Sequence, residues 1–259
     1  MMLVKLGGSV ITDKSKYRTF RPETVHRLAK EMADSGERLI VVHGAGSYGH
    51  VIAKKYELHM GRKAPGQEKG VAQVSWDVRE LDTLVLKALV EEGLDAVSLV
   101  PGSCTMLTDG KLTSVDLDKF RRYFDMGVTP VTFGDVALDS KREFGICSGD
   151  QMMEVLAERF RPKRAIFVTD VDGVYSCDPH MDKGAKLIPE IDRSTLADLP
   201  RSTRCDDVTG SIYAKIEYML GIASHAKECL IINGNVPGRL RAALCGEVPT
   251  CSRVKEVRE

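Results

Sequence analysis

The stretch Leu39–His50, LIVVHGAGSYGH, shows how this chain is built. Its apolar start, Leu39–Val42, predicts a buried strand. The strand runs into a turn with three glycines, which allow positive φ and bring backbone N–H groups close to an anion. A strand, a glycine-rich turn and a helix from about Ser47 form a unit in which α/β proteins commonly hold phosphate. The turn alone is weak evidence, because many such turns are only tight connections.

Length and composition indicate an ordinary globular protein. The chain has 259 residues, 43% of them hydrophobic, which is enough for one large α/β domain or two small ones. Lys and Arg together number 37, as do Asp and Glu, so the formal net charge is zero. That balance argues against a general nucleic-acid binder, which usually carries a basic excess.

The sequence also gives an expectation for where in the cell the protein is located. No apolar run approaches the ~20 residues that span a bilayer, and the first residues lack a signal-peptide layout. We therefore expect no membrane partner. The seven cysteines are scattered singly and form no Cys-x-x-Cys pair. Reduced thiols in a cytoplasmic protein are the expected state, without a disulfide framework or a zinc site.

Strands and helices are expected to alternate along the whole chain. Strands are predicted at Met2–Leu6, Leu39–Val42, Ala96–Val100, Val128–Phe133, Ala165–Thr169 and Leu230–Asn233. Helices are predicted at Glu23–Ser35, Val71–Glu92, Asp116–Met126, Ser148–Arg159 and Gly210–Cys229. Asp135–Phe144 reads as a hairpin or an excursion at the sheet edge, and Thr250–Val254 as an edge strand.

This order predicts an α/β fold in a single domain. An open, mostly parallel central sheet would carry helices on both faces, as an αβα sandwich. Ligands in such folds bind beyond the carboxyl ends of the strands. The turns that follow strands, Gly7–Ser9, His43–His50 and Thr169–Gly173, are therefore the places to look for a site.

Two of these turns carry candidate phosphate ligands. Lys5 lies in an apolar strand before Gly7, Gly8 and Ser9, and burying a lysine is costly unless it meets an anion. The plain alternative is a solvated lysine on an edge strand, and Lys14 could likewise be an ordinary loop residue.

In the second turn, His50 could donate a hydrogen bond to a phosphate held by Gly44–Gly46. It could equally be a packing histidine on a helix. His43, at the end of a buried strand, is expected to be a structural residue.

Three further groups come later in the chain. Gly149 and Asp150 begin a helix, so Asp150 is either a capping or a catalytic acid. Thr169–Tyr175, extended by Asp178, could hold a nucleoside or a divalent cation, or form a plain Asp/Gly turn. Thr209-Gly210-Ser211 begins a helix whose N-terminus can take a phosphate, with Lys215 one turn further on. Lys215 by itself is also consistent with a solvated helix lysine.

Other nucleotide and catalytic patterns are missing from the sequence. There is no Gly-x-x-x-x-Gly-Lys-Ser/Thr, no Gly-x-Gly-x-x-Gly with a suitably spaced ribose-binding acid, and no Gly-x-Ser-x-Gly. Several lysines and three glycine turns at one sheet edge fit phosphoryl transfer between two bound phosphates. Such transfer works mainly by positioning and charge neutralisation.

The order of these motifs resembles the amino acid kinase superfamily. Within it, Gly7–Lys14 (GGSVITDK) and Gly44–His50 (GAGSYGH) resemble the isopentenyl phosphate kinase family. The resemblance implies ATP-dependent phosphorylation of isopentenyl phosphate to isopentenyl diphosphate, in the alternative mevalonate route of isoprenoid biosynthesis. It also implies a homodimer, with Mg²⁺ carried by ATP rather than by an assigned protein site.

The resemblance also assigns roles to residues. Lys5, Lys14 and Lys215 would neutralise the transferring phosphoryl group and the ATP phosphates, and Asp150 would orient the lysines or Mg²⁺. His50, at the end of its turn, would contact the acceptor phosphate. The remaining ATP-binding residues would be Gly7, Gly8, Ser9, Thr169, Asp170, Tyr175, Asp178 and Gly210, and the remaining acceptor-binding residues Gly44, Ala45, Gly46 and Gly149.

The resemblance also implies that the two halves of the chain bind different substrates. Residues 1–148 would bind mainly the acceptor and residues 149–259 mainly the nucleotide. The prenyl tail needs an apolar pocket, for which Ile52, Met60, Val74 and Trp76 are candidates, although ordinary core packing would explain them too. The alternative functions are a phosphonate kinase of the fosfomycin-resistance type and a non-catalytic small-molecule sensor on the same fold.

Overall fold

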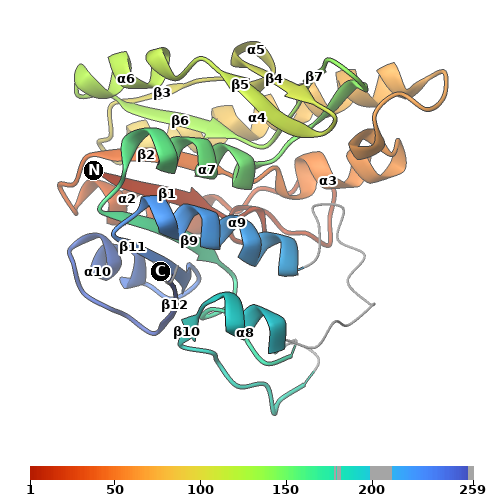
Figure 1. Ribbon diagram of the computed structural model, residues 1–259. Coiled ribbons are helices and arrows are strands. Elements are labelled where there is room, and N and C mark those ends of the chain that lie inside the picture. The colour runs from red at the N-terminus through yellow and green to blue at the C-terminus, as the bar shows by residue number, and fades with distance from the viewer. Residues whose placement is uncertain (178, 180–181, 199–211, 256–259) are drawn as a thin grey trace.

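A large, mostly parallel sheet runs through the centre of the molecule (Figure 1). The computed structural model describes residues 1–177, 179, 182–198 and 212–255. In these residues the large sheet has eight strands. Their order across the sheet is β10 (Glu190–Ile191), β12 (Cys251–Val254), β11 (Glu228–Asn233), β9 (Arg164–Thr169), β1 (Met2–Leu6), β2 (Leu39–His43), β6 (Thr129–Phe133) and β3 (Ala96–Ser98).

Helices cover both faces of this sheet, as the sequence predicts. Val4 and Leu6 point to one face and Leu3 to the other, because side chains alternate along a strand. The first face packs against α2 (Pro22–Ala33), α4 (Gln67–Glu91) and α10 (Arg239–Leu244). The second packs against α6 (Leu117–Asp125), α7 (Gly149–Phe160) and α9 (Ile212–His225), of which α7 and α9 lie in front of the sheet in Figure 1.

A second sheet of four strands was not anticipated as a whole. Its order is β5 (Lys111–Val115), β4 (Thr105–Thr108), β7 (Asp135–Asp139) and β8 (Glu143–Cys147). The β7–β8 pair is the expected hairpin, three residues longer than predicted. Strands β4 and β5 were missed because their residues are largely polar and half exposed, so they lack a clear apolar alternation.

Several short elements complete the chain. α1 (Gly8–Ile11) is a single turn directly after Gly7, and α3 (Gly46–Lys55) follows the glycine-rich turn. The 3₁₀ turn η1 (Leu58–Met60), α5 (Pro101–Cys104) and α8 (Arg193–Asp198) complete the described helices. Helix α4 begins at Gln67, four residues before the predicted start, and α10 was not predicted.

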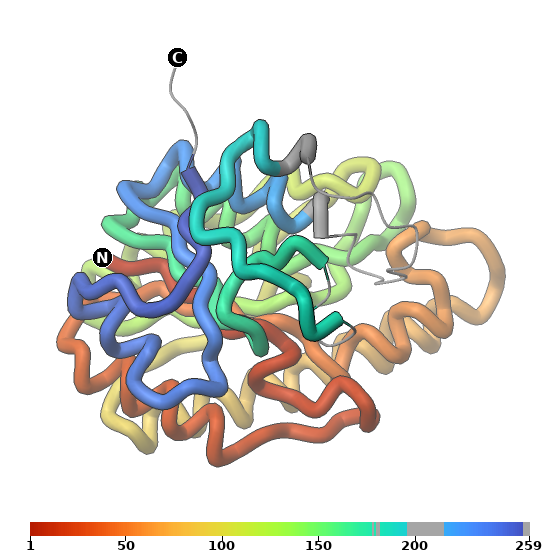
Figure 2. Tube along the Cα trace, turned by 90° about the horizontal axis from the view of Figure 1, so that it is seen from below, coloured from red at the N-terminus to blue at the C-terminus, as the bar shows by residue number. Residues whose placement is uncertain are grey.

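The expectation that Thr250–Val254 forms an edge strand is wrong. β12 lies between β10 and β11 and runs antiparallel to β11. Figure 2 shows this late segment, in dark blue, beside the teal segment that contains β10 and α8. Ser252, fully buried in β12, accepts a hydrogen bond from the Val174 amide (2.9 Å) and donates one to the Ile188 carbonyl (2.6 Å). The strand therefore holds the segment that follows β9.

Within the described residues, no helix combines the length and apolar character needed to cross a bilayer. The predicted site residues Asp178 and Gly210 lie outside the described part of the chain, as do Thr209 and Ser211.

The central strand provides a test of the core. Leu3 is fully buried among the side chains facing α7 and α9, so Leu3→Ala should lower the free energy of unfolding by about 3 kcal/mol. Leu138, which is 61% exposed on β7, provides the matched control. Leu138→Ala should change the free energy of unfolding by less than about 0.5 kcal/mol in the same urea titration. Equal losses would contradict the assignment of these faces.

Candidate active site

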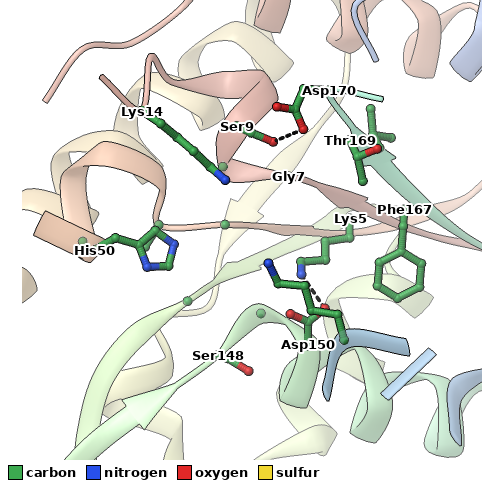
Figure 3. A pocket seen from close by; sticks show the side chains of 18 of the residues that line it. Lys5, Gly7, Ser9, Lys14, His50, Ser148, Asp150, Phe167, Thr169 and Asp170 are labelled. Carbon is green, nitrogen blue, oxygen red and sulfur yellow. Dashed lines mark hydrogen bonds and ion pairs between the residues drawn. The ribbon is translucent and has the colours of Figure 1, made fainter. Parts of the chain in front are cut away.

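A cavity lies along the carboxyl-terminal edge of the large sheet. Strands β1, β2, β6 and β9 are parallel, so the turns that follow them meet at this edge. The cavity has a volume of about 250 Å³ and is lined by residues from all four turns. Figure 3 shows Lys14 and His50 on one side of it and Phe167, Thr169 and Asp170 on the other, with Lys5 between them.

Lys5 is the central cation of this cavity. It sits near the end of β1, between β2 and β9, and its side chain is 14% exposed. The ammonium lies 2.5 Å from Asp150 Oδ1 and 5.7 Å from the centre of the Phe167 ring. The alternative of a solvated edge-strand lysine is therefore wrong, because β1 is interior and Lys5 has a buried partner.

Asp150 is available to Lys5 because another residue caps its helix. Ser148 Oγ accepts a hydrogen bond from the backbone N–H of Gln151 at 3.2 Å, and Gln151 Oε1 accepts one from the backbone N–H of Ser148 at 3.0 Å. This reciprocal capping box satisfies the N-terminus of α7. Asp150, in the first helical turn and 8% exposed, instead faces the cavity and Lys5. The interpretation of Asp150 as an ordinary cap is therefore wrong.

Most of the predicted nucleotide-side residues converge on the cavity. Gly7, Gly8, Ser9, Lys14, Thr169, Asp170 and Lys215 all line it. Ser9 Oγ donates to Asp170 Oδ1 at 2.8 Å, which joins the turn after β1 to the turn after β9 (Figure 3). A side chain at Gly7 would bring its Cβ within 2.6 Å of the Val168 carbonyl oxygen, so only glycine fits this contact.

The predicted acceptor-side residues Gly44, Ala45, His50 and Gly149 also line the cavity. His43, in contrast, is fully buried and structural, as predicted. Its Nε2 lies 3.2 Å from Asp82 Oδ1 and its Nδ1 lies 3.2 Å from the Gly44 carbonyl oxygen. The ring also stacks on Phe133, with centroids 5.1 Å apart. These contacts hold the start of the glycine-rich turn.

Two predicted residues lie elsewhere. Of the predicted positions that the structure describes, Gly46 and Tyr175 do not line the cavity. Gly46 has a φ of +49° and packs against Thr12 and Gly8 instead of lining the cavity. Among the candidates for an apolar pocket, Val74 lines the cavity and is 2% exposed, whereas Trp76 is 65% exposed. Ile52 and Met60 are also absent from the described lining.

Apolar side chains at both ends of the cavity were missed by sequence reasoning. Near His50 the additional apolar lining comes from Ala53 and Ile146. Near Thr169 it comes from Phe167, Val168, Val171, Val174, Met219 and Ile231. No local motif distinguishes these residues from core positions, because their patterns are those of ordinary buried strands and helices.

The segment after β9 is held in place by polar contacts. Asp172 accepts hydrogen bonds from Asn233 Nδ2, at 3.0 Å, and from the Arg239 guanidinium. Burial acts to raise the pKa of Asp172, but these hydrogen bonds and the Arg239 charge outweigh it and lower the pKa. The carboxylate therefore stays ionised and ties this segment to β11 and α10.

Asp135 is a further carboxyl at the cavity that sequence reasoning missed. It lies two residues after the end of β6, at the start of β7, so the rule that residues after parallel strands form sites could have found it. Its side chain is fully enclosed, accepts the Gly102 amide at 3.1 Å and lies 3.6 Å from Arg79. Burial raises the pKa of Asp135 to about 6, against the opposing effect of Arg79.

The cavity as a whole suits phosphorylated ligands. Three lysines and the N–H groups of two glycine turns can neutralise and hold phosphate oxygens. Within the described residues, no group of three or more His, Cys, Asp or Glu side chains could hold a metal ion.

Comparisons with known proteins agree with this geometry. Residues 1–233 match the family model described as the amino acid kinase family. A curated isopentenyl phosphate kinase from Thermoplasma acidophilum is 40% identical over 93% of this chain and 94% of its own length. An X-ray structure of isopentenyl phosphate kinase superposes with a TM-score of 0.87 at 33% identity, covering 98% of this chain and all of the other. A crystal structure of an isopentenyl phosphate kinase substrate complex has a TM-score of 0.82 at 36% identity, with the same coverage.

Asp135 predicts a pH-dependent stability. Its pKa in the folded protein, about 6, lies above the value of 3.8 for an unperturbed aspartate, so the folded state binds the proton more tightly. Its contribution to stability is therefore complete below about pH 4 and is lost as the pH rises through about 6. Relative to Asp135→Asn, the wild type should lose ~2 kcal/mol of unfolding free energy between pH 4 and pH 7.

Urea titrations of both proteins across this pH range measure the difference, since other titrating groups are common to both. A constant difference between the two proteins would show that Asp135 does not titrate in this way.

Proposed function

The chain belongs to the amino acid kinase family, among the isopentenyl phosphate kinases, and on this premise we propose that it phosphorylates isopentenyl phosphate with ATP. The products are isopentenyl diphosphate and ADP. The observation that carries the proposal is the cavity in which two glycine turns, three lysines and His50 meet. Such a site can hold a donor and an acceptor phosphate side by side.

The reaction is a direct in-line transfer. An oxygen of the acceptor phosphate forms a bond to the γ-phosphorus of ATP while the bond from that phosphorus to the β–γ bridging oxygen breaks. The electron pair of the broken bond leaves with ADP. No side-chain base is required, because a phosphate oxygen of the acceptor is already ionised at neutral pH. The protein contributes alignment and charge neutralisation.

We assign the donor phosphates to the turn after β1. Gly7, Gly8 and Ser9 would hold them, with Lys5, Lys14 and Lys215 around the transferring group. Mg²⁺ bound to the ATP phosphates would supply further charge neutralisation, with Asp150 and Asp170 close by. The nucleoside would lie beyond Thr169, among the apolar side chains of Val174, Met219 and Ile231. On this assignment the nucleoside would lie mainly in the second half of the chain, whereas the donor phosphates would also contact residues of the first half.

We assign the acceptor to the turn after β2. Gly44, Ala45 and Gly149 would hold its phosphate, with His50 donating a hydrogen bond. The apolar lining beside His50, from Ala53, Val74 and Ile146, suits a short hydrocarbon tail. That lining favours a prenyl phosphate over the small, polar acceptor of a fosfomycin-type phosphonate kinase. A non-catalytic sensor would have no need for the buried Lys5–Asp150 pair.

Two further properties belong to the same proposal. We infer a homodimer acting in the cytoplasm, from the family resemblance and from the scattered cysteines of the sequence, which are free within the described residues. Light scattering on the purified protein measures the mass directly. The balanced charge supports small phosphorylated ligands as partners, without nucleic acid.

A coupled assay of ADP release tests the function. Purified protein with Mg-ATP should produce ADP in step with isopentenyl diphosphate when isopentenyl phosphate is supplied. Fosfomycin at the same concentration should give no ADP above background, since it lacks a tail for the apolar lining. ADP release with fosfomycin alone would favour the phosphonate kinase, and none with either acceptor would favour the sensor.

His50 provides a test of the acceptor side. His50→Ala removes a hydrogen bond to a charged phosphate, so the KM for isopentenyl phosphate should rise roughly 10- to 100-fold. The KM for ATP should stay within about 2-fold. Lys54→Ala, an exposed position on the same helix, is the matched control and should leave both KM values unchanged. A rise in the KM for ATP, with the KM for isopentenyl phosphate unchanged, would contradict the assignment of His50.

A further inference from the structure

The donor turn and the acceptor turn touch through their backbones. Here the donor turn is Gly7–Ser9 and the acceptor turn is Gly44–Gly46. A Cβ added at Gly8 would lie 2.6 Å from both N and Cα of Gly46, and one added at Gly44 would lie 2.6 Å from the Gly8 nitrogen. Real side chains do not approach this closely, so the two turns are packed main chain against main chain. The two turns therefore lie too close together for a side chain at Gly8 or Gly44.

One hydroxyl group joins the two turns. Thr12 Oγ1 donates a hydrogen bond to the Gly8 carbonyl at 2.6 Å and accepts one from the Ser47 amide at 3.0 Å. Gly8 belongs to the donor turn, and Ser47 follows the acceptor turn directly. Thr12 is 0% exposed, so water cannot replace either bond. A hydroxyl is the smallest side-chain group that both donates and accepts.

Thr12 also leads into the loop that carries Lys14. The far end of the Lys14 loop is bound to Ser47, in the first turn of α3. The backbone amide of Arg18 donates to the Ser47 carbonyl oxygen at 3.4 Å, and that of Thr19 donates to the Ser47 hydroxyl at 3.2 Å. Thr12 and Ser47 therefore fix both ends of the Lys14 loop as well as the two turns. Thr12 is not itself among the described residues that line the cavity, so it does not contact the reacting atoms.

We propose that Thr12 is a positioning residue for phosphoryl transfer. Its hydroxyl sets the separation between the donor and acceptor phosphates and keeps Lys14 between them. This inference rests on the proposed function. In-line transfer is sensitive to such a separation, because a shift of about 1 Å in the reacting groups can cost roughly 100-fold in rate. Each substrate contacts its own turn, so the separation matters for kcat more than for the binding of either substrate alone.

Three variants test the proposal. Thr12→Val keeps the shape but removes the hydroxyl, and should lower kcat roughly 10- to 100-fold while both KM values stay within about 3-fold. Thr12→Ser keeps the hydroxyl and should retain kcat within about 3-fold. Thr132→Val is the matched control: Thr132 is equally buried and donates to the Leu99 carbonyl at 2.9 Å, but it lies outside both turns. Thr132→Val should lose less stability than Thr12→Val, because it removes one buried hydrogen bond instead of two, and should match the wild type in kcat.

The outcomes separate this inference from the proposed function. A wild type that transfers nothing to isopentenyl phosphate would defeat the function before any variant is compared. An active wild type with Thr12→Val at full kcat, or with Thr12→Ser as slow as Thr12→Val, would overturn the positioning role. So would a loss seen equally in the dissociation constants of both substrates. If Thr12→Val does not fold, Thr12→Ala takes its place against Thr12→Ser, because it leaves the neighbouring backbone more room.

Discussion

A lysine buried in a central strand requires a negative partner, and much of this site depends on how the chain supplies one. Lys5 finds Asp150, and neither side chain is more than 14% exposed. A buried charge left alone would be costly, so Asp150 must arrive at a defined point. It does so because the β7–β8 hairpin ends at Cys147, immediately before the cap of α7. The second sheet therefore fixes where the partner of Lys5 is placed.

The sequence predicted the elements whose signals are local. The four strands in the middle of the large sheet, β11, β9, β1 and β2, are mostly apolar, and the turns after β1, β2 and β9 carried the motifs. Other features depend on the tertiary structure. β12 has no signal that separates an interior from an edge strand, and β4 and β5 are too polar to stand out. Local sequence could not show whether Asp150 caps its helix or pairs with a cation, because its partner Lys5 lies 145 residues away in the chain.

The order of strands explains why the cavity has a polar middle and apolar ends. β1 is central, with β9 and β11 on one side and β2 and β6 on the other. The cation of Lys5 therefore lies between two apolar regions of the cavity lining. Val174 and Ile231 lie at one end, and Val74 and Ile146 at the other. The charged groups therefore lie in the middle of this sheet edge, and the apolar side chains that can pack against a ligand lie at its two ends.

The interior position of β12 has a consequence for how the protein is made. This strand follows all other described strands in the chain, yet Ser252 anchors the segment after β9 and β10 has no neighbour without it. On the ribosome, where chains emerge and fold from the N-terminus, β1, β2, β6 and β9 can pair early. The end of the cavity that we assign to the nucleoside cannot be completed until β12 has emerged. A nascent chain therefore has the framework of the cavity well before the segment after β9 is anchored.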